Sequence, residues 1–550
     1  MEQQQQKKSV KEFDRDKCTE SRIEEGVSIR KEKRAARLDR RRDRPPPPTA
    51  AAGGGGIQID ESFLLLLKEN VSQAVQVACQ NIGAAAGNSP ETIAKGLDQI
   101  LCLVNRDATT HPLDVAFRNI PAEETCKRLV GLMSTFEEAF RPYVLKICNI
   151  FLEIVTQYNP QVLTFQAQWD QVMMNTGFFD CAVKHITAAA AGGGGSAIAE
   201  RLVHVVLVFM DLHPMNAQKM LQRYRVQEWI TKTSPEYMAW YLYVVMHQKK
   251  PVHPYENIMT SDLWNFWMHT LKTQQPDNPV FQDALCAANH CARRPSVAKA
   301  IVEAVPFERW MQLFTGAADE FLRQQQQDDD CWLLQQVTCM LAIAAEEKDA
   351  GRVMDACAKY FYKLVPRFST GNFMTRCMMH IFYSYVSISA DKVKQFVQNG
   401  FLTNVAERLA ANDIHRQEYN TVVKFLLGIV STCLQHTVKS VGTANSITVY
   451  NMFFGTPTLI QGMLQQLSSS SGNPEHMLTA LRVLSTALSW EKLLGYRFIH
   501  NQIEDDDKWD FIEDLSYKHD NVDVQLAAQE VIDTRAKDHA RNNHEMDLSE

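Results

Sequence analysis

The 550-residue sequence predicts an all-α fold in which amphipathic helices follow one another along most of the chain. Three segments, residues 63–82, 129–155 and 421–438, place apolar residues at i, i+3, i+4 and i+7, which is the spacing of one helix face. Alternating runs bounded by Asn-Gly or Asp-Gly turns, the usual sign of β-hairpins, are not evident. A hydrophobic content of 45% is sufficient for a large core.

The first 56 residues have a different composition from the rest. They are polar and repetitive, and they end in a Pro run followed by a Gly run. Such a segment cannot bury enough apolar surface to fold alone, so we expect a disordered arm over 1–56. Within it, Ser28–Arg44 carries nine Arg or Lys against three acids, although the whole chain has a net charge of -7. A basic arm on an acidic body suits binding to an acidic partner or to the body itself.

Low-complexity runs interrupt the helical pattern at residues 188–196, 324–330 and 468–472. Because such runs are tolerated in exposed loops and not in cores, we expect them to connect helical units. Similar apolar helices recur at spacings of 35 to 52 residues, which fits armadillo or HEAT repeats with insertions. We therefore predict one armadillo-repeat right-handed solenoid over 57–535 and an acidic tail over 536–550. The repeat register is set at Trp169, His204, Trp240, Cys286, Thr338, Met378 and Thr421.

The cysteine pattern indicates reduced core thiols. The chain has 13 Cys, an odd number, without CxxC pairs. The nearest approach to a metal cluster is Cys286, His290 and Cys291, which lacks a second ligand pair, so no metal site and no cofactor are expected. The N-terminus has no apolar signal-peptide core and no uncharged run is long enough to span a membrane. P-loop, GxGxxG, HExxH and GxSxG patterns are absent from the sequence, so we expect no enzyme.

Three stretches resemble the importin-alpha family. The arm segment within about 20–44 is similar to the RKxKR and (K/R)RR core of an importin-beta-binding segment. In the body, residues 160–169, 238–256, 280–292 and 397–409 resemble armadillo-repeat openings of that family. Near the end, residues 511–532 are similar to its final half-repeat. The matching basic residues are Arg30, Lys31, Lys33, Arg34, Arg37, Arg40, Arg41 and Arg42.

The resemblance implies a nuclear import adaptor. Such a protein binds nuclear-localisation-signal cargo in a concave groove, is linked to importin-beta through its arm, and is recycled by a nuclear export receptor. Shuttling between cytoplasm and nucleus follows from it, without direct nucleic-acid or membrane binding. The groove residues that the resemblance implies are Trp169, Trp240 and Asp211, since Trp faces hold Lys stems and groove acids hold Lys heads.

Two departures from the family pattern stand out. Family members place an Asn four residues after each groove Trp, on the same helix face. In the register above, the corresponding positions hold Met173, Val208, Val244, His290, Ala342, Phe382 and Phe425. Upstream of Val27 the arm also reads SRIEEG, where family arms often carry a further Arg cluster.

Alternative interpretations remain open at this point. Trp169 and Trp240 could be ordinary core aromatics, and Asp211 a plain loop acid. The chain could be a specialised importin-alpha paralogue with non-classical cargo, because the Asn positions are changed. It could instead be an armadillo scaffold whose basic tail binds nucleic acid, although the tail lacks interleaved aromatic residues for base stacking.

Overall fold

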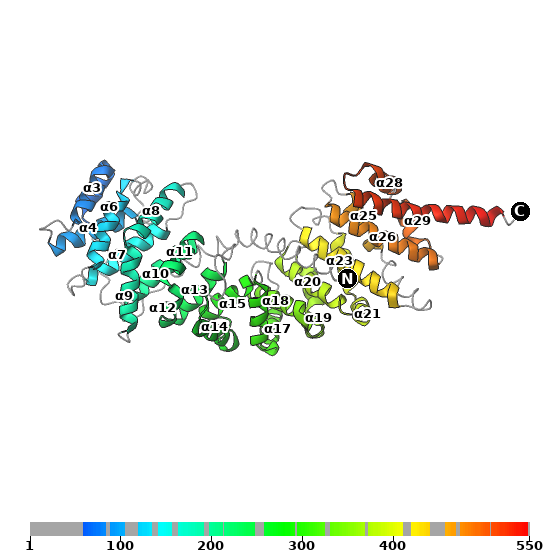
Figure 1. Cartoon of the computed structure of the whole chain (residues 1–550), viewed down its shortest axis with the longest axis horizontal. Coiled ribbons are helices and arrows are strands. Elements are labelled where there is room, and N and C mark those ends of the chain that lie inside the picture. The colour runs from blue at the N-terminus through cyan, green and yellow to red at the C-terminus, as the bar shows by residue number, and fades with distance from the viewer. Residues whose placement is uncertain are drawn as a thin grey trace. The chain divides into compact units, whose positions relative to one another are not determined.

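The structure is a computed structural model, and all secondary-structure elements of its described part are helices (Figure 1). It describes residues 59–83, 89–104, 119–134, 141–156, 163–191, 197–212, 214–247, 258–291, 294–324, 331–368, 372–410, 420–440, 457–468, 473–494, 496–505 and 508–547. The arm and the tail's last residues lie outside these ranges. Within them, no helix combines the length and apolar character required to cross a bilayer.

The chain divides into two compact units, and the boundary falls between His290 and Cys291. The N-terminal unit contains α2 (Glu61–Glu69), α3 (Val71–Asn81), α4 (Pro90–Val104), α6 (Ala122–Ser134), α7 (Arg141–Thr156), α8 (Leu163–Asn175), α9 (Phe178–Ala191), α10 (Ala197–Leu212), α11 (Pro214–Tyr224), α12 (Val226–Trp229), the 3₁₀ turn η3 (Ile230–Lys232), α13 (Pro235–His247), α14 (Ser261–Thr273) and α15 (Pro279–His290).

The C-terminal unit continues with helices of the same kind. They are α16 (Pro295–Ala304), α17 (Phe307–Gln324), α18 (Trp332–Ala344), the π-helix η7 (Ala345–Asp349), α19 (Ala350–Leu364), the 3₁₀ turn η8 (Val365–Arg367), α20 (Phe373–Val386), α21 (Ala390–Gln398), α22 (Phe401–Leu409), α23 (Asn420–Ser440), α25 (Pro457–Ser468), α26 (Pro474–Leu494), α27 (Phe498–Asp505), α28 (Trp509–Lys518) and α29 (Val522–Asp547).

One helix of each repeat packs against its counterpart in the next repeat, and we call these the ladder helices. In the N-terminal unit the ladder runs α4, α7, α10, α13, α15, and each helix contacts the next. In the C-terminal unit it runs α18, α20, α23, α26, α29. Hydrogen bonds between repeats accordingly join residues 41 to 53 apart in sequence. This stacking of sequence neighbours is the architecture of an armadillo/HEAT-type helical solenoid, so the predicted fold class is confirmed.

Local chemistry explains where the helices begin and end. The predicted helix over 63–82 is two helices, because the Asn70 side chain accepts a hydrogen bond from the Gln73 N–H and caps α3. The segment 129–155 is likewise shared by α6 and α7, whereas 421–438 lies in one helix, α23. Between α21 and α22 the chain turns at Gly400, whose φ of 77° favours glycine.

Most residues of the three low-complexity runs lie outside the described residues, and the described ones lie at helix ends. The first run begins inside α9, which includes its alanines up to Ala191, and α10 starts at Ala197. The second and third runs follow the ends of α17 and α25. Alanine is the best helix former, which explains why α9 extends into the run.

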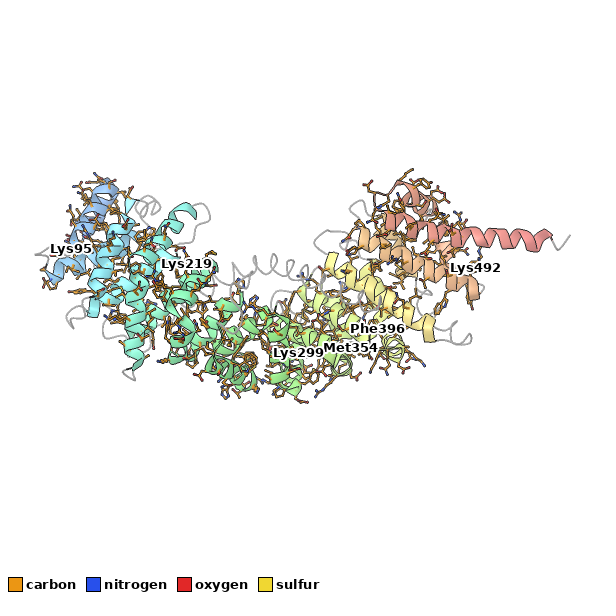
Figure 2. The ribbon with its side chains drawn as sticks, in the orientation of Figure 1. Lys95, Lys219, Lys299, Met354, Phe396 and Lys492 are labelled. Carbon is orange, nitrogen blue, oxygen red and sulfur yellow. The ribbon has the colours of Figure 1, made fainter. Side chains whose placement is uncertain are left out.

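Aromatic side chains hold the layers of each unit together. In the N-terminal unit the Phe151 and Phe178 rings lie 4.0 Å apart, and Phe179 lies 4.5 Å from Phe209. In the C-terminal unit Phe382 contacts both Phe361 and Phe401. Figure 2 shows side chains filling the space between the helices of each unit, including the buried Met354 and Phe396. All described cysteines except Cys286 are buried, which agrees with the prediction of core thiols.

Candidate protein-binding surface on the ladder helices

Polar and aromatic pairs join neighbouring ladder helices along their partly exposed side. We call each of these pairs a rung. In the first rung Lys146 of α7 pairs with Asp98 of α4, with the two charged atoms 2.6 Å apart. In the second, the Nε of Arg201 in α10 donates to the Asn149 Oδ1 of α7 at 2.8 Å. Lys146 and Asn149 are three residues apart and so share one face of α7.

The next rungs of the N-terminal unit consist of histidine and aromatic rings. His204 of α10 packs edge-on against Trp240 of α13, with centroids 5.0 Å apart, and also approaches Tyr237. Between α13 and α15, the Nδ1 of His247 lies 3.3 Å from the Nε2 of His290. Each ladder junction in this unit therefore has at least one rung, and the rungs named here change from charged to aromatic along the chain.

The C-terminal unit repeats the arrangement with other residues. The Nε2 of His380 in α20 lies 2.8 Å from the Glu346 Oε1 of η7, and the His380 ring packs on Phe425 of α23. Between α23 and α26, Lys424 approaches Glu475 at 3.8 Å. The rung surface presents carboxylate, imidazole, ammonium and aromatic groups together, which suits contact with a protein segment of mixed character.

The sequence-derived register is correct for six of its seven anchors and wrong at the first. Six anchors, from His204 to Thr421, lie on ladder helices. Trp169 instead lies in α8, which packs mainly on α6 and α9; the ladder helix before α10 is α7. The missed helix carries Lys146 and Asn149, which form two rungs. The apolar run KICNIFLEIV within 129–155 was the signal that could have identified it.

The predicted groove residues occupy different environments. Trp169 is 1% exposed and Trp240 is 5% exposed, so protein atoms cover both indoles, and the Trp240 ring contacts His204 edge-on. Asp211 lies in the last turn of α10 and is half-buried. The three residues lie on three different helices, α8, α10 and α13.

Most residues at the predicted Asn positions face the core: Val208, Val244 and Phe382 are at most 3% exposed. Two of the seven, His290 and Phe425, take part in rungs, through His247 and His380. The buried positions therefore do not describe the surface, which lies on neighbouring faces of the same helices. Two asparagines, Asn149 and Asn289, do lie on ladder helices at partly exposed positions.

The predicted importin-beta-binding residues, from Arg30 to Arg42, lie outside the described residues, and so does the segment around them. The C-terminal half-repeat is described. It consists of α28 and α29, joined by a turn in which Asn521 accepts hydrogen bonds from the N–H groups of Asp523 and Val524. Because α29 packs on both α28 and α26, this helix pair closes the C-terminal ladder.

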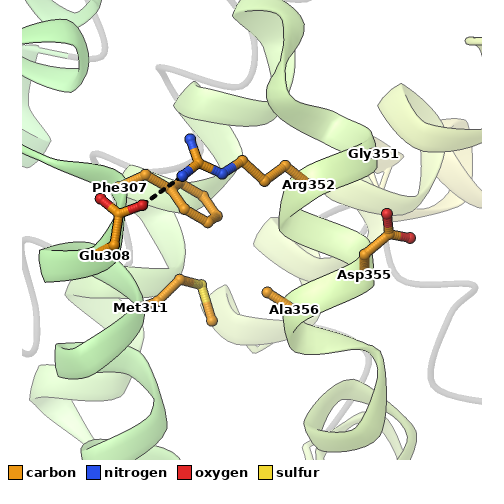
Figure 3. Close-up of a pocket in the computed structure, with 7 residues that line it drawn as sticks. All are labelled: Phe307, Glu308, Met311, Gly351, Arg352, Asp355 and Ala356. Carbon is orange, nitrogen blue, oxygen red and sulfur yellow. Dashed lines mark hydrogen bonds and ion pairs between the residues drawn. The ribbon is translucent and has the colours of Figure 1, made fainter.

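A separate depression of about 660 Å³ lies between α17 and α19, away from the ladder helices (Figure 3). The Arg352 guanidinium lies over the Phe307 ring, 4.1 Å from its centroid, and pairs with Glu308. Met311 and Ala356 form its apolar floor. The charged groups at its rim are more than half exposed, so the depression is open to solvent.

Thiol chemistry gives no support for catalysis on this surface. Burial raises the pKa of Cys148 in α7 and of Cys291 to about 12, so both stay protonated at neutral pH. In the part of the chain that the structure describes, no group of three or more His, Cys, Asp or Glu side chains is placed to hold a metal ion.

Comparison with known proteins gives no family for this chain. No protein-family model matches it, and no curated protein matches its sequence. Among solved structures, similar chains come from a study of a phosphorylation switch between cadherin and beta-catenin (10% identity, 83% of this chain and 98% of that one, TM-score 0.42) and from SYS-1 (9%, 87% and 93%, 0.36). Yeast importin-beta is a third (9%, 87% and 68%, 0.33). Identities of 9–10% and TM-scores of 0.33–0.42 are too low to assign a function to this chain.

Proposed function

We propose that this chain is a nuclear import adaptor of the importin-alpha type, with a modified cargo surface. The observation that carries the proposal is the basic segment Ser28–Arg44, placed directly ahead of a helical-repeat array. Its spacing of RKEKR, Leu38 and RRR is similar to an importin-beta-binding core. A nuclear export receptor would return the adaptor to the cytoplasm, so the chain would shuttle between the two compartments.

The described fold supports the scaffold part of the proposal. A ladder of stacked helices offers a long surface on which an extended segment can contact several repeats, and such scaffolds act by binding proteins. The helix pair α28–α29, which spans the resemblance to the family's last half-repeat, packs on the ladder helix α26. Residues 1–44 carry a net charge of +5 and the whole chain -7, so residues 45–550 carry -12. An acidic body of this kind attracts basic cargo.

The rungs support a cargo preference different from that of classical adaptors. A classical clamp needs an Asn amide that is available to the peptide backbone. Here the Asn149 oxygen accepts from Arg201, and the His204–Trp240 and His247–His290 junctions place imidazoles on the surface. We therefore expect weak binding of Lys-rich signals and selection of a different protein segment by the same ladder surface.

The arm is tested by its affinity for importin-beta. Calorimetry with the full chain is expected to show tight, salt-sensitive binding, because many charged contacts form. The triple variant R40A/R41A/R42A is expected to weaken it by at least about 10-fold, from the loss of three charge-assisted contacts. The matched control K7A/K8A changes basic residues of the same arm outside the segment and should bind as the wild type does. No binding of importin-beta, or retention of RNA alone, would refute the proposal.

The cargo surface is tested separately. The R40A/R41A/R42A chain is titrated with a classical Lys-rich signal peptide. The three substitutions remove the Arg cluster through which the arm could otherwise bind the ladder surface in place of the peptide. We expect a dissociation constant weaker than about 10 μM, since affinity here rests on few exposed groups. Tighter binding would show that the ladder surface is classical.

A further inference from the structure

The exposed charges in the first half of α19 are paired with residues of the neighbouring helices. Arg352 pairs with Glu308 of α17, with a nitrogen-to-oxygen distance of 2.5 Å (Figure 3). Three residues further along α19, the Asp355 Oδ1 lies 3.7 Å from the Nζ of Lys392 in α21. Because positions three residues apart share a helix face, both pairs lie on one exposed stripe of α19. The charges of this half of the stripe are therefore balanced.

The second half of the same stripe carries cations alone. Lys359 follows Asp355 by four residues, and Lys363 and Arg367 continue at the same spacing into η8. All three are exposed, and none of them forms an ion pair within the part of the chain that the structure describes. The Asp319 carboxylate of α17 accepts a hydrogen bond from the Tyr360 hydroxyl instead.

An exposed aromatic ring and a further cation lie beside these three. Tyr362 is 56% exposed, although its ring contacts Phe401 with centroids 6.3 Å apart. The Arg408 guanidinium of α22 donates a hydrogen bond to the Val365 carbonyl, which places a fourth cation at η8. Tyr is enriched in protein interfaces, since it combines an apolar ring with a polar tip. We call Lys359, Tyr362, Lys363 and Arg367 the α19 patch.

The charge of the α19 patch selects an acidic partner. Residues 45–550 carry a net charge of -12, so a surface of cations without carboxylate partners is a local reversal of sign. The stripe from Lys359 to Arg367 extends over about 12 Å at the rise of a helix. Proteins that make roughly 6 to 10 phosphate contacts on nucleic acid need more cations than this. A short stretch of Asp and Glu with one apolar side chain matches the patch in both charge and length.

We propose that the α19 patch binds an acidic segment of a partner protein. Carboxylates of the segment contact Lys359, Lys363 and Arg367, and an apolar side chain of the segment packs on Tyr362. The patch lies on α19 and η8, which are not ladder helices, so this partner does not compete for the ladder surface. The inference is independent of the proposed transport function.

The test uses the full wild-type chain and a peptide in which Asp and Glu surround one Phe. A carbodiimide couples a carboxylate to a lysine amine where the two are in contact, and mass spectrometry reports each position, so adducts on the basic arm are counted separately. We expect adducts at Lys359 and Lys363 to be at least about 5-fold more frequent than at the exposed Lys68, Lys219 and Lys272. Equal frequencies at all five lysines would overturn the proposal.

A double variant tests whether the patch acts as a unit. K363A/R367A keeps Lys359 as the reporter, and we expect its adducts to fall at least about 5-fold, since two charged contacts are lost. The matched control K68A/K219A removes the same charge from exposed positions of the N-terminal unit and should leave the Lys359 adducts unchanged. Unchanged Lys359 adducts in K363A/R367A would overturn the proposal. Loss of the adducts on addition of an equimolar short oligothymidine would do so too, because it would assign the patch to nucleic acid.

Discussion

The Nζ of Lys146 in α7 lies 2.6 Å from the Oδ1 of Asp98 in α4, and the Asp98 side chain is only 8% exposed. The pair joins the first two ladder helices of the N-terminal unit. The stability of a buried carboxylate depends on its paired cation far more than that of a surface carboxylate does, because little water is available to replace the cation.

Lys146→Met is therefore expected to destabilise the α4–α7 junction by about 2 to 3 kcal/mol, since Asp98 is left without its cation. Hydrogen exchange of the α4 and α7 amides measures the loss locally. The control is Lys127→Met, whose pair with Glu123 is exposed on both sides and should change stability by less than about 0.5 kcal/mol. Equal effects of the two substitutions would contradict this account.

Two helical glycines are expected to respond to alanine with opposite signs. A Cβ at Gly96 in α4 would lie 2.7 Å from the Asn81 Cβ and 2.9 Å from the Asn81 carbonyl carbon, so α3 must move. Gly96→Ala should cost about 2 kcal/mol. A Cβ at Gly131 in α6 meets nothing within 4 Å, so Gly131→Ala should stabilise by about 0.5 to 1 kcal/mol. Urea unfolding compares the two; a stabilising Gly96→Ala would refute the close approach.

The start of α27 depends on a buried carboxylate. Glu491 is 3% exposed, and its two oxygens accept the N–H groups of Ile499 and His500. In Glu491→Gln an amide NH₂ replaces one of these acceptors, so we expect a loss of about 1 to 3 kcal/mol and faster proteolysis near α27. Glu530→Gln, at an exposed position of α29, serves as control. Unchanged proteolysis in Glu491→Gln would exclude the capping role.

High pH should destabilise the N-terminal unit through Tyr224. Burial raises the pKa of its phenol to about 12, with a further contribution from Asp180, which accepts its hydrogen bond. The unfolded phenol ionises near pH 10, so this contribution is intact below pH 10 and is lost as pH rises from about 10 to 12. Tyr224→Phe should lose less stability than the wild type between pH 9 and 11.5 in urea titrations. Parallel pH profiles would contradict the prediction.

Much of the fold could be predicted from apolar spacing, because burial of one helix face requires that spacing whatever the partner. The ladder helices around His204, Trp240 and Thr421 follow from it. The division at Asn70 could not be read from the apolar pattern, since a single capping side chain produces it. The register anchor at Trp169 was misplaced because a buried Trp is compatible with any core helix and does not distinguish a ladder helix from its neighbours.

The rungs could not be predicted from the sequence. Each joins residues from different helices, such as Asn149 and Arg201, and a pair of this kind leaves no periodic trace in the sequence. His290 was noted for its neighbouring cysteines, yet its contact is His247. Shifts of one helical position also decide whether a residue faces the core or the surface, and the register alone could not show that Val208 and Val244 are buried.

The connection between ladder neighbours has a consequence for how the protein is made. Each ladder helix contacts counterparts about one repeat away in sequence, so every junction can close soon after its second helix leaves the ribosome. Folding then needs no distant segment to arrive. An insertion between repeats, such as the Gln-Asp run after α17, delays the synthesis of the next helix but does not change the junctions that have already formed.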